Sequence, residues 1–461
     1  MKYLAKVSIF KYRFEVLLLF VIGEVLLFET NDNLHLLITL IEYLFVFIAL
    51  VNNYRIGIMY FVSFTLLALS QDNFLIHDSL PNSFWGVRAF GFSLNIIFSF
   101  LIFIYCIVIT KKTKIKIDIN LKFFIYFIIY SIISGTVFTL LSKNYIDNFV
   151  QDLLTYSPFF IYSYLLSLLD VISLKEIIKK GLSLTVFAMI LSYISNKMFQ
   201  YGEGNYFVLV NNFSFIVIIA VFILRDLFKK WQYILLISCI IFLLLNGDIF
   251  IGGKQIILLF VVLFWFALNY KKYAIPILLL FVFFILFIEP TISFISNYYA
   301  GNVISFKFTQ IFTLVENFDL SLIASTKSSM GNIIAEAITL FDYFVDNPIL
   351  LVTGKGFGGA IPDTMGYLAP WAGSSGYAYQ DLLRNDFHKL HLPVYEIILK
   401  TGLLGFLFYF YIIVRFFKSK NRYMLIYLIL FLTVFYVTKE LLLITLVFLS
   451  ISKQVEINSN I

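Results

Sequence analysis

Two histidines stand close together in the C-terminal part of the chain. His388 and His391 belong to residues 384–391, RNDFHKLH. An imidazole accepts a proton near neutral pH, which makes histidine a common general base. The neighbouring cations Arg384 and Lys389 favour the neutral, proton-accepting form of both rings. Two polar residues at a membrane interface are the ordinary interpretation of this segment, and a general base is the alternative.

A second segment, Gly354-Lys355-Gly356-Phe357-Gly358-Gly359, is rich in glycine and carries a lysine. Such a composition suggests phosphate binding, but the pattern GxxxxGK[ST] is missing and no strand is expected before it. A Walker nucleotide site is therefore excluded. Tight packing of the backbone is the first interpretation of this loop. Contact with a lipid-linked pyrophosphate, which would involve Lys355, is the second.

Composition indicates which class of protein must position these groups. Of the 461 residues, 61% are hydrophobic and 13% are charged, whereas soluble domains have about 45–50% and about 25%. Continuously apolar stretches of about 20 residues, the length that crosses a bilayer, recur along the chain. Cys106 and Cys239 both lie in such stretches and have no metal-site or disulfide spacing. We expect an all-α polytopic membrane protein without a metal or other cofactor.

The apolar stretches predict about fourteen transmembrane helices. They cover residues 14–30, 34–51, 56–70, 90–110, 122–142, 156–174, 181–197, 206–224, 232–250, 255–270, 273–290, 393–414, 423–438 and 440–452. This pattern predicts an N-terminal bundle of about 11 spans over residues 1–289 and about three C-terminal spans over residues 393–461. Between them lies one large loop, residues 290–392.

Basic residues predict the orientation of these helices. Most of the 34 Lys and Arg lie at alternate ends of the spans, on the side that also holds the basic N-terminal residues 2–13. Positive residues in short loops mark the cytoplasmic side. Both termini are therefore expected in the cytoplasm, and the loop 290–392 is expected to be extracytoplasmic. The net charge of +7 is thus a topology signal and does not predict a nucleic-acid partner.

Basic residues on the outer side oppose this topology signal, so their presence there needs another explanation. An ordinary solvated side chain is the more common explanation for any one of them, and anion binding is the alternative. The residues concerned are Arg88, Lys254, Lys327, Lys355, Arg384 and Lys389.

Within the loop, apolar residues at helical spacing predict an amphipathic helix that lies on the membrane domain. Ser325-Thr326 precede it and Asp346-Asn347-Pro348 end it. Its apolar positions are Ile333, Ile334, Ala337, Ile338, Phe341 and Phe344.

The residues after the loop resemble a known family. His391-Leu392 is followed by nine residues and then by Gly402-Leu403-Leu404-Gly405. This is similar to the H-[N/S/Q]-x9-G-x-x-G signature of the O-antigen ligase and Wzy-type polysaccharide polymerase superfamily, whose His stands at the outer start of the helix after a large periplasmic loop. Residues 346–357 also resemble the family's NP-L-G-x-G-x-F segment, and Gly252-Gly253-Lys254-Gln255 lies where the family has a small-residue/Arg motif.

The chain departs from the family pattern at several positions. Leu392 replaces a polar residue, Lys254 replaces an arginine, and Lys400 stands where an acidic residue is common. The arginine expected before the loop helix is at best Lys327, several residues out of register.

The resemblance implies a metal-independent glycosyltransferase in the bacterial cytoplasmic (inner) membrane, with its active site on the periplasmic face. Such an enzyme transfers a glycan from undecaprenyl pyrophosphate to a sugar hydroxyl. The hydroxyl needs a base, which would be His391 or, second, His388. The pyrophosphate needs cations. Lys254 is the first candidate, followed by Arg88 and Lys327, while Arg384 would position His391 or the substrate.

Three functions remain open. The first is a repeat-unit polymerase for O-antigen or capsule-type polysaccharide, with lipid-linked oligosaccharides as donor and acceptor and a chain-length regulator as a candidate protein partner. The second is a ligase of the same superfamily. The third, from another class, is a lipid-linked oligosaccharide flippase. Against the flippase, the chain shows no internal repeat, and its ionisable residues gather at the outer rim and not at mid-bilayer.

Overall fold

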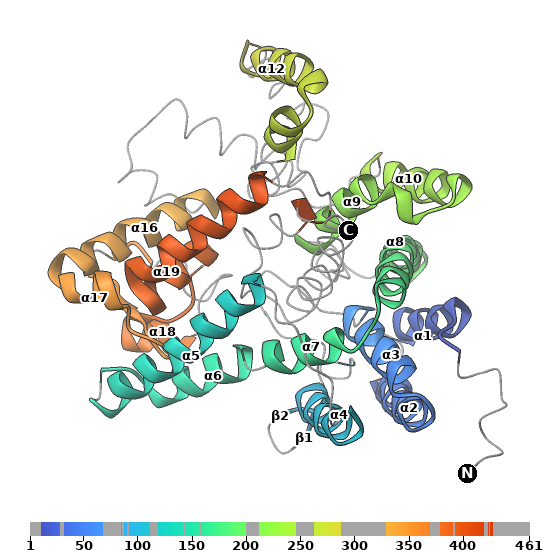
Figure 1. The fold of residues 1–461 in the computed structure, drawn as a ribbon, viewed down its shortest axis with the longest axis horizontal. Coiled ribbons are helices and arrows are strands. Elements are labelled where there is room, and N and C mark those ends of the chain that lie inside the picture. Colours follow the sequence, from blue (N-terminus) through green and yellow to red (C-terminus); the bar gives the residue numbers. More distant parts are fainter. Residues whose placement is uncertain are drawn as a thin grey trace. The chain divides into compact units, whose positions relative to one another are not determined.

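The computed structural model describes residues 11–27, 32–67, 84, 87–89, 92–110, 119–141, 143–156, 158–199, 212–245, 262–286, 329–364, 366–368, 379–390, 392–418, 423 and 425–426. These residues are mostly helical (Figure 1). The described strands form two short antiparallel pairs. β1 (Arg88–Ala89) pairs with β2 (Phe92–Ser93), and β3 (Ile361–Pro362) pairs with β4 (Asp386–Phe387).

The chain forms two compact units. Unit 1 comprises Met1–Leu121, Ser157–Ile249 and Thr438–Ile461, and unit 2 comprises Lys122–Tyr156 and Phe250–Val437. The described part of the predicted loop 290–392 thus belongs to the same unit as residues 122–156.

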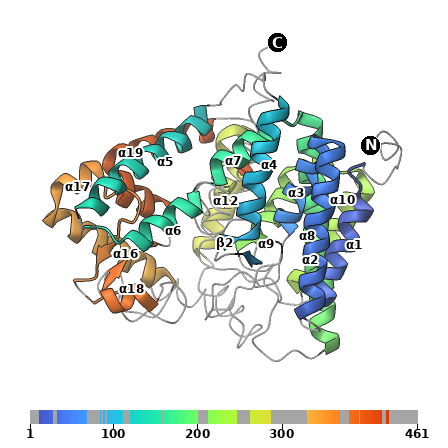
Figure 2. The same cartoon turned by 90° about the horizontal axis from the view of Figure 1, so that it is seen from below.

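Unit 1 is a helical bundle. Its helices are α1 (Phe14–Leu27), α2 (Asp32–Asn52), α3 (Tyr54–Leu67), α4 (Leu94–Thr110), α7 (Pro158–Ser167), α8 (Val171–Phe199), α9 (Asn212–Ile223) and α10 (Lys230–Leu245). α1, α2, α3 and α8 pack side by side (Figure 2). Aromatic rings fill the space between them, and the Tyr60 ring contacts those of Tyr12, Phe45 and Phe64.

Unit 2 combines long apolar helices with short elements. Its helices are α5 (Ile119–Leu140, which begins at the edge of the unit), α6 (Ile146–Tyr156), α12 (Lys271–Leu286), α16 (Ser329–Asp346), α17 (Pro348–Thr353), α18 (Tyr379–Arg384) and α19 (Pro393–Lys418). A buried core joins α16, the β3–β4 pair and α19. Its residues include Leu340, Phe344, Ile361, Phe387 and Leu399.

The helices agree with the predicted membrane class. Asn33–Asn52 and Val394–Lys418 are each long and apolar enough to cross a bilayer. Two further segments, Ile146–Ser167 and Val171–Leu191, meet at a bend of 119°. If they form one broken span, it is a third candidate crossing. The described residues therefore contain at least two candidate spans. The total of about fourteen remains a prediction.

One predicted boundary is wrong. The spans 156–174 and 181–197 were expected to be joined by a loop that contains the lysines 175–180. Instead α7 ends at Ser167, and α8 runs unbroken from Val171 to Phe199. Asp170 Oδ1 accepts a hydrogen bond of 2.7 Å from the Ser173 N–H, in the manner of a helix N-cap. The helix therefore starts before the lysines, which lie along its first turns.

Unit 1 also corrects the expectation that ionisable residues lie only at the outer rim. Glu24 of α1 and both His35 and Glu42 of α2 are buried within the helical hairpin. His35 Nε2 lies 3.9 Å from Glu24 Oε1, and the Thr39 hydroxyl donates to the same oxygen at 3.5 Å. Because Glu42 stands in the middle of α2, the case against a transporter loses this argument, while the absence of an internal repeat from the sequence still counts against it.

The predicted amphipathic helix in the loop is present as α16, but its inward face differs from the prediction. Phe344 and Ile333 are buried as expected. Phe341, in contrast, is 72% exposed, while Asn332 and Glu336 are buried. Apolar periodicity locates an amphipathic helix, yet it cannot say whether the apolar side faces protein or the surroundings.

Candidate functional site

The centre of the site is a buried carboxylate on α6, the helix that follows α5 in unit 2. Asn148, Asp152 and Tyr156 lie four residues apart, so they share the buried face of this helix. Asp152 is 1% exposed. A carboxylate at this depth is costly unless charges and hydrogen bonds compensate it.

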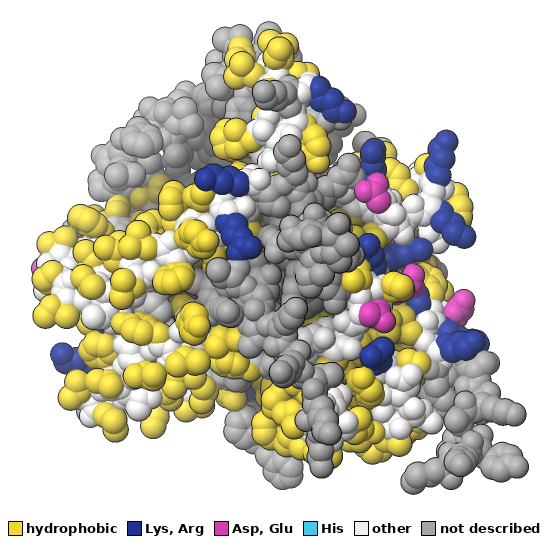
Figure 3. Space-filling view, viewed as in Figure 1, with side chains coloured by type: hydrophobic (Ala, Val, Ile, Leu, Met, Phe, Trp, Pro, Cys, Tyr) yellow, Lys and Arg dark blue, Asp and Glu magenta, His cyan; other side chains and the backbone are white. Residues whose placement is uncertain are grey.

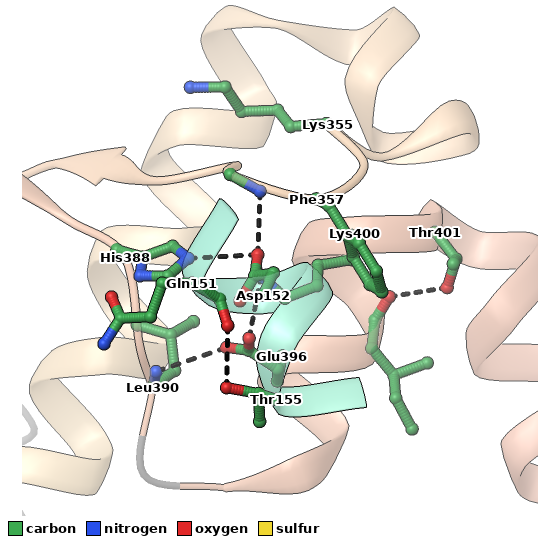
Figure 4. A network of polar contacts seen from close by, with 12 residues as sticks. Gln151, Asp152, Thr155, Lys355, Phe357, His388, Leu390, Glu396, Lys400 and Thr401 are labelled. Carbon is green, nitrogen blue, oxygen red and sulfur yellow. Dashed lines mark hydrogen bonds and ion pairs between the residues drawn. The ribbon is translucent and has the colours of Figure 1, made fainter. Parts of the chain in front are cut away.

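Three nitrogen atoms surround one oxygen of this carboxylate (Figure 4). Asp152 Oδ2 accepts hydrogen bonds of 2.5 Å from Lys400 Nζ and 2.7 Å from the Gly358 N–H. His388 Nε2 lies 3.0 Å from the same oxygen. The positive charge of the Lys400 ammonium favours the ionised form of the acid. Asp152 therefore ties together α6, the glycine-rich loop, the segment before α19 and α19 itself.

A second carboxylate completes the cluster. Glu396 stands one helical turn before Lys400 on α19, and its Oε1 lies 2.9 Å from Lys400 Nζ. Its other oxygen accepts a hydrogen bond of 3.3 Å from the Leu390 N–H. The Lys400 ammonium is thus held between two acids, and the backbone just after His388 is fastened to α19. We call Asp152, His388, Glu396 and Lys400 the Asp152 cluster.

The glycine-rich loop supports the cluster through its backbone. α19 is kinked at Gly402, where φ is 63°. The Leu399 and Lys400 carbonyls just before the kink accept hydrogen bonds of 2.8 and 2.9 Å from the N–H groups of Lys355 and Gly356. The loop therefore supplies donors to carbonyls at the interruption of the helix, and it fixes the backbone that carries Lys400.

The glycines of this loop allow close backbone contacts. A Cβ atom at Gly356 would overlap the backbone of Gly135 on α5, and one at Gly354 would overlap the backbone of Lys400 and Thr401. Gly402 has a positive φ and faces the Val352 carbonyl in the same way. Tight packing, the first interpretation from the sequence, is what the geometry provides.

The structure places three of the predicted site residues in unit 2. His388 belongs to the Asp152 cluster and is 1% exposed. Arg384 Nη1 lies 2.9 Å from Asp147 Oδ2, and its guanidinium lies 4.2 Å from the centre of the Tyr145 ring. Lys355 is buried, and its ammonium donates a hydrogen bond of 2.7 Å to the Ala360 carbonyl.

The remaining predicted residues are not brought to this cluster by the described structure. Arg88 belongs to unit 1, where it lies exposed on β1. His391, Lys254 and Lys327 lie outside the described residues.

Burial changes the acid–base properties of groups around the cluster. It lowers the pKa of the Lys389 ammonium, although the charges of Asp152 and Glu396 act in the opposite direction. It also lowers the pKa of Lys355, against the charge of Asp386. Burial raises the pKa of the Asp386 carboxyl, against the charges of Lys355 and His388. These groups share a poorly hydrated environment, where electrostatic interactions are stronger than in water.

Sequence reasoning missed Asp152 and Glu396, and it treated Lys400 only as a departure from a family pattern. Two local signals were available. Glu396 and Lys400 are spaced as an i,i+4 pair on a helix. Residues 146–156 are amphipathic, with Asn148 and Asp152 on one face.

The arrangement is suited to holding a segment of chain in place and to orienting a histidine. Asp152 is engaged by several donors, and His388 turns its Nε2 toward it (Figure 4). Within the ranges that the structure describes, no group of three His, Cys, Asp or Glu side chains is placed to hold a metal ion.

Comparison of the chain with known protein families, with curated proteins and with solved structures finds no match.

Proposed function

We propose that this protein is a membrane-embedded glycosyltransferase that polymerises lipid-linked repeat units. The observation that supports this most is the Asp152 cluster, which fixes the backbone of residues 388–390 just ahead of α19. His391 follows this fastened segment directly, and α19 is a candidate membrane-crossing helix. A base at such a place can reach a hydroxyl of a lipid-linked sugar at the membrane surface.

In this proposal the two histidines have different roles. His388 is buried, and its Nε2 faces Asp152, so it has no room for a substrate hydroxyl. It serves as a positioning residue for the segment that ends at His391. His391 is the general base. It takes the proton of the acceptor hydroxyl while the oxygen bonds to the anomeric carbon of the donor sugar.

The same step breaks the bond between the anomeric carbon and the pyrophosphate oxygen, and undecaprenyl pyrophosphate leaves with the electron pair. Its negative charge calls for cations in a poorly hydrated site. Lys254 remains the first candidate, followed by Arg88 and Lys327. The ammonium of Lys355 and the guanidinium of Arg384 already bond within unit 2, so we assign them first to the architecture of the site.

Surface glycan from a strain that lacks the gene tests the proposed reaction. A single repeat unit on lipid A-core is the result expected for a polymerase. Polymer stranded on undecaprenyl pyrophosphate would contradict it and identify a ligase. Repeat units trapped on the cytoplasmic side would also contradict it and identify a flippase.

The cation assignment has its own test. Lys254→Ala is expected to abolish polymer, because the leaving group loses its counter-charge, whereas Lys254→Arg is expected to retain it. The measurement is polymer amount and length after complementation of the deletion strain. Normal polymer with Lys254→Ala would show that Lys254 does not bind the pyrophosphate.

A further inference from the structure

The outward side of α16 carries apolar residues where a helix in contact with water would carry polar ones. Asn332, Glu336 and Thr339 are buried. Phe341 and Val345 are 72% and 61% exposed. This distribution is the reverse of that on a helix at the surface of a soluble protein, which turns its polar side outward.

The exposed apolar side continues onto α17. Ile349 is 77% exposed and Val352 is 49% exposed, whereas Leu350 between them packs on the core. Phe341, Val345, Ile349 and Val352 follow one another at spacings of four, four and three residues. We call these four residues the α16–α17 stripe.

The stripe is continuous with helices of membrane character. α17 packs against α19, a candidate membrane-crossing helix. The Tyr130 hydroxyl of α5 also donates a hydrogen bond of 2.7 Å to the Thr353 carbonyl at the end of α17. α19 and α5 both expose apolar side chains, among them Leu404 and Phe408 of α19 and Ile133 of α5. Figure 3 shows hydrophobic side chains predominating on this face of unit 2, over α16, α17, α19 and α5.

We propose that α16 and α17 lie in one leaflet of the bilayer, with the α16–α17 stripe in contact with lipid acyl chains. The occupant of this surface is thus the membrane. An exposed apolar surface of this extent needs a partner, and lipid already has to cover the neighbouring surface of α19. This inference rests on the membrane character of the chain and does not depend on the proposed glycosyl transfer.

Polar groups limit how deeply the two helices are immersed. α16 is not among the helices that are apolar enough to cross a bilayer. Asp346, at the turn between α16 and α17, is exposed, and the Asp342 carboxylate beside the stripe accepts a hydrogen bond from the Thr364 hydroxyl. These carboxylates belong at the level of the headgroups. The two helices are therefore interfacial, with their apolar side about 5–10 Å into the headgroup and acyl boundary.

This placement changes the interpretation of the segment that contains α16 and α17. From the sequence, residues 290–392 form a loop outside the membrane. With α16 and α17 embedded, these two helices of that loop lie in the leaflet. A lipid-borne molecule then meets unit 2 within the plane of the membrane.

Spin labels on the full-length protein in phospholipid nanodiscs test the inference. The background carries Cys106→Ala and Cys239→Ala, and single cysteines are introduced as Phe341→Cys and Ile349→Cys. Leu383→Cys on α18 is the matched control. Leu383 is 70% exposed, like the stripe residues. It is expected to face water, because the neighbouring Arg384 forms a partly exposed ion pair with Asp147. Collision rates with oxygen, which concentrates in lipid, and with a water-soluble nickel chelate are then compared. Elution as a single symmetrical peak identifies folded samples.

The ratio of oxygen to nickel collisions is expected to be severalfold higher at positions 341 and 349 than at position 383. A low ratio at all three positions, with nickel favoured, would show that water covers the stripe and would overturn the inference. So would dipolar broadening between labels at position 341 of two molecules, because a second copy of the chain would then cover the stripe. Should Phe341→Cys fail to fold, Ile349→Cys with its Leu383→Cys control decides the question.

Discussion

Each of the two units buries charged side chains, but in different ways. In unit 2 the Asp152 carboxylate lies 2.5 Å from an ammonium and 3.0 Å from an imidazole, and the second carboxylate of the cluster lies 2.9 Å from the same ammonium. In unit 1 the buried residues Glu24, His35, Thr39 and Glu42 form a second group, in which His35 lies 3.9 Å from Glu24. We call this group the Glu24 group. Short contacts to a lysine keep a buried carboxylate charged.

The comparison suggests different tasks for the two groups. The Asp152 cluster joins four chain segments through charged contacts, so it acts as a fixed support. Buried polar networks whose members are well bonded rigidify a structure. The Glu24 group connects α1 with α2.

Asp152→Asn is expected to have the largest effect. It keeps the size of the side chain but leaves Lys400 and His388 without their shared carboxylate, and removal of one partner from a buried ion pair costs about 3–5 kcal/mol. Thermal unfolding of the purified protein in detergent measures the loss. Polymer in cells should fall together with the amount of folded protein.

A double variant sharpens this test. Asp152→Asn combined with Lys400→Met removes both charges of the closest pair and should be less destabilised than the sum of the two single variants. Simple additivity would mean that the two groups do not interact, and it would argue against the support role of the cluster.

His391→Ala is expected to abolish polymer, because the acceptor hydroxyl loses its base, while leaving the amount of folded protein unchanged. The measurements are surface glycan and the thermal midpoint of unfolding. His77→Ala, in a predicted outer loop, is the control and should keep normal polymer. Wild-type polymer length and amount with His391→Ala would rule out its role as the base.

His388→Gln distinguishes positioning from catalysis. Because His388 contacts Asp152 inside the cluster, its loss is expected to lower the thermal midpoint and polymer together. Loss of polymer at unchanged stability would instead make His388 the base and would reverse our assignment of the two histidines.

Gly402→Ala should destabilise the protein by more than Gly366→Ala. Both glycines have a positive φ, 63° and 71°, which costs a residue with a Cβ atom about 1–2 kcal/mol. Only at Gly402 does the new Cβ meet backbone atoms, those of Val352 and Gly354, whereas at Gly366 nothing lies within 4 Å. Equal shifts of the thermal midpoint would show that the contact between α17 and the kink of α19 is not tight.

Glu42→Gln is expected to have the smallest effect, less than about 1 kcal/mol, because it keeps the size of the side chain and its ability to form hydrogen bonds. Its thermal midpoint is measured beside that of Asp152→Asn. A loss as large as that of Asp152→Asn would mean that Glu42 is a paired anion, and the contrast between the two groups would fail.

Several local features of the structure were predictable. The helical nature of the chain, most helix positions and the helix at residues 329–346 follow from apolar content and period. The end of that helix before Asn347-Pro348 follows from the restriction that proline imposes on the residue before it. The start of α8 before its lysines was missed, because the N-cap at Asp170 is a weaker signal than a run of basic residues.

The amino-acid sequence by itself determined the membrane class of this protein, the approximate positions of its helices and the spacing from His391 to Gly402 and Gly405. These features depend on each residue and its near neighbours. Only the tertiary structure decided that Asp152 meets Lys400, a contact across 248 positions of the chain. That contact depends on how α6 and α19 pack around the glycine-rich loop. The periodicity of apolar residues in the sequence does not predict this packing. The tertiary structure likewise decided that Phe341 faces outward, because a protein in lipid can turn an apolar side chain either way.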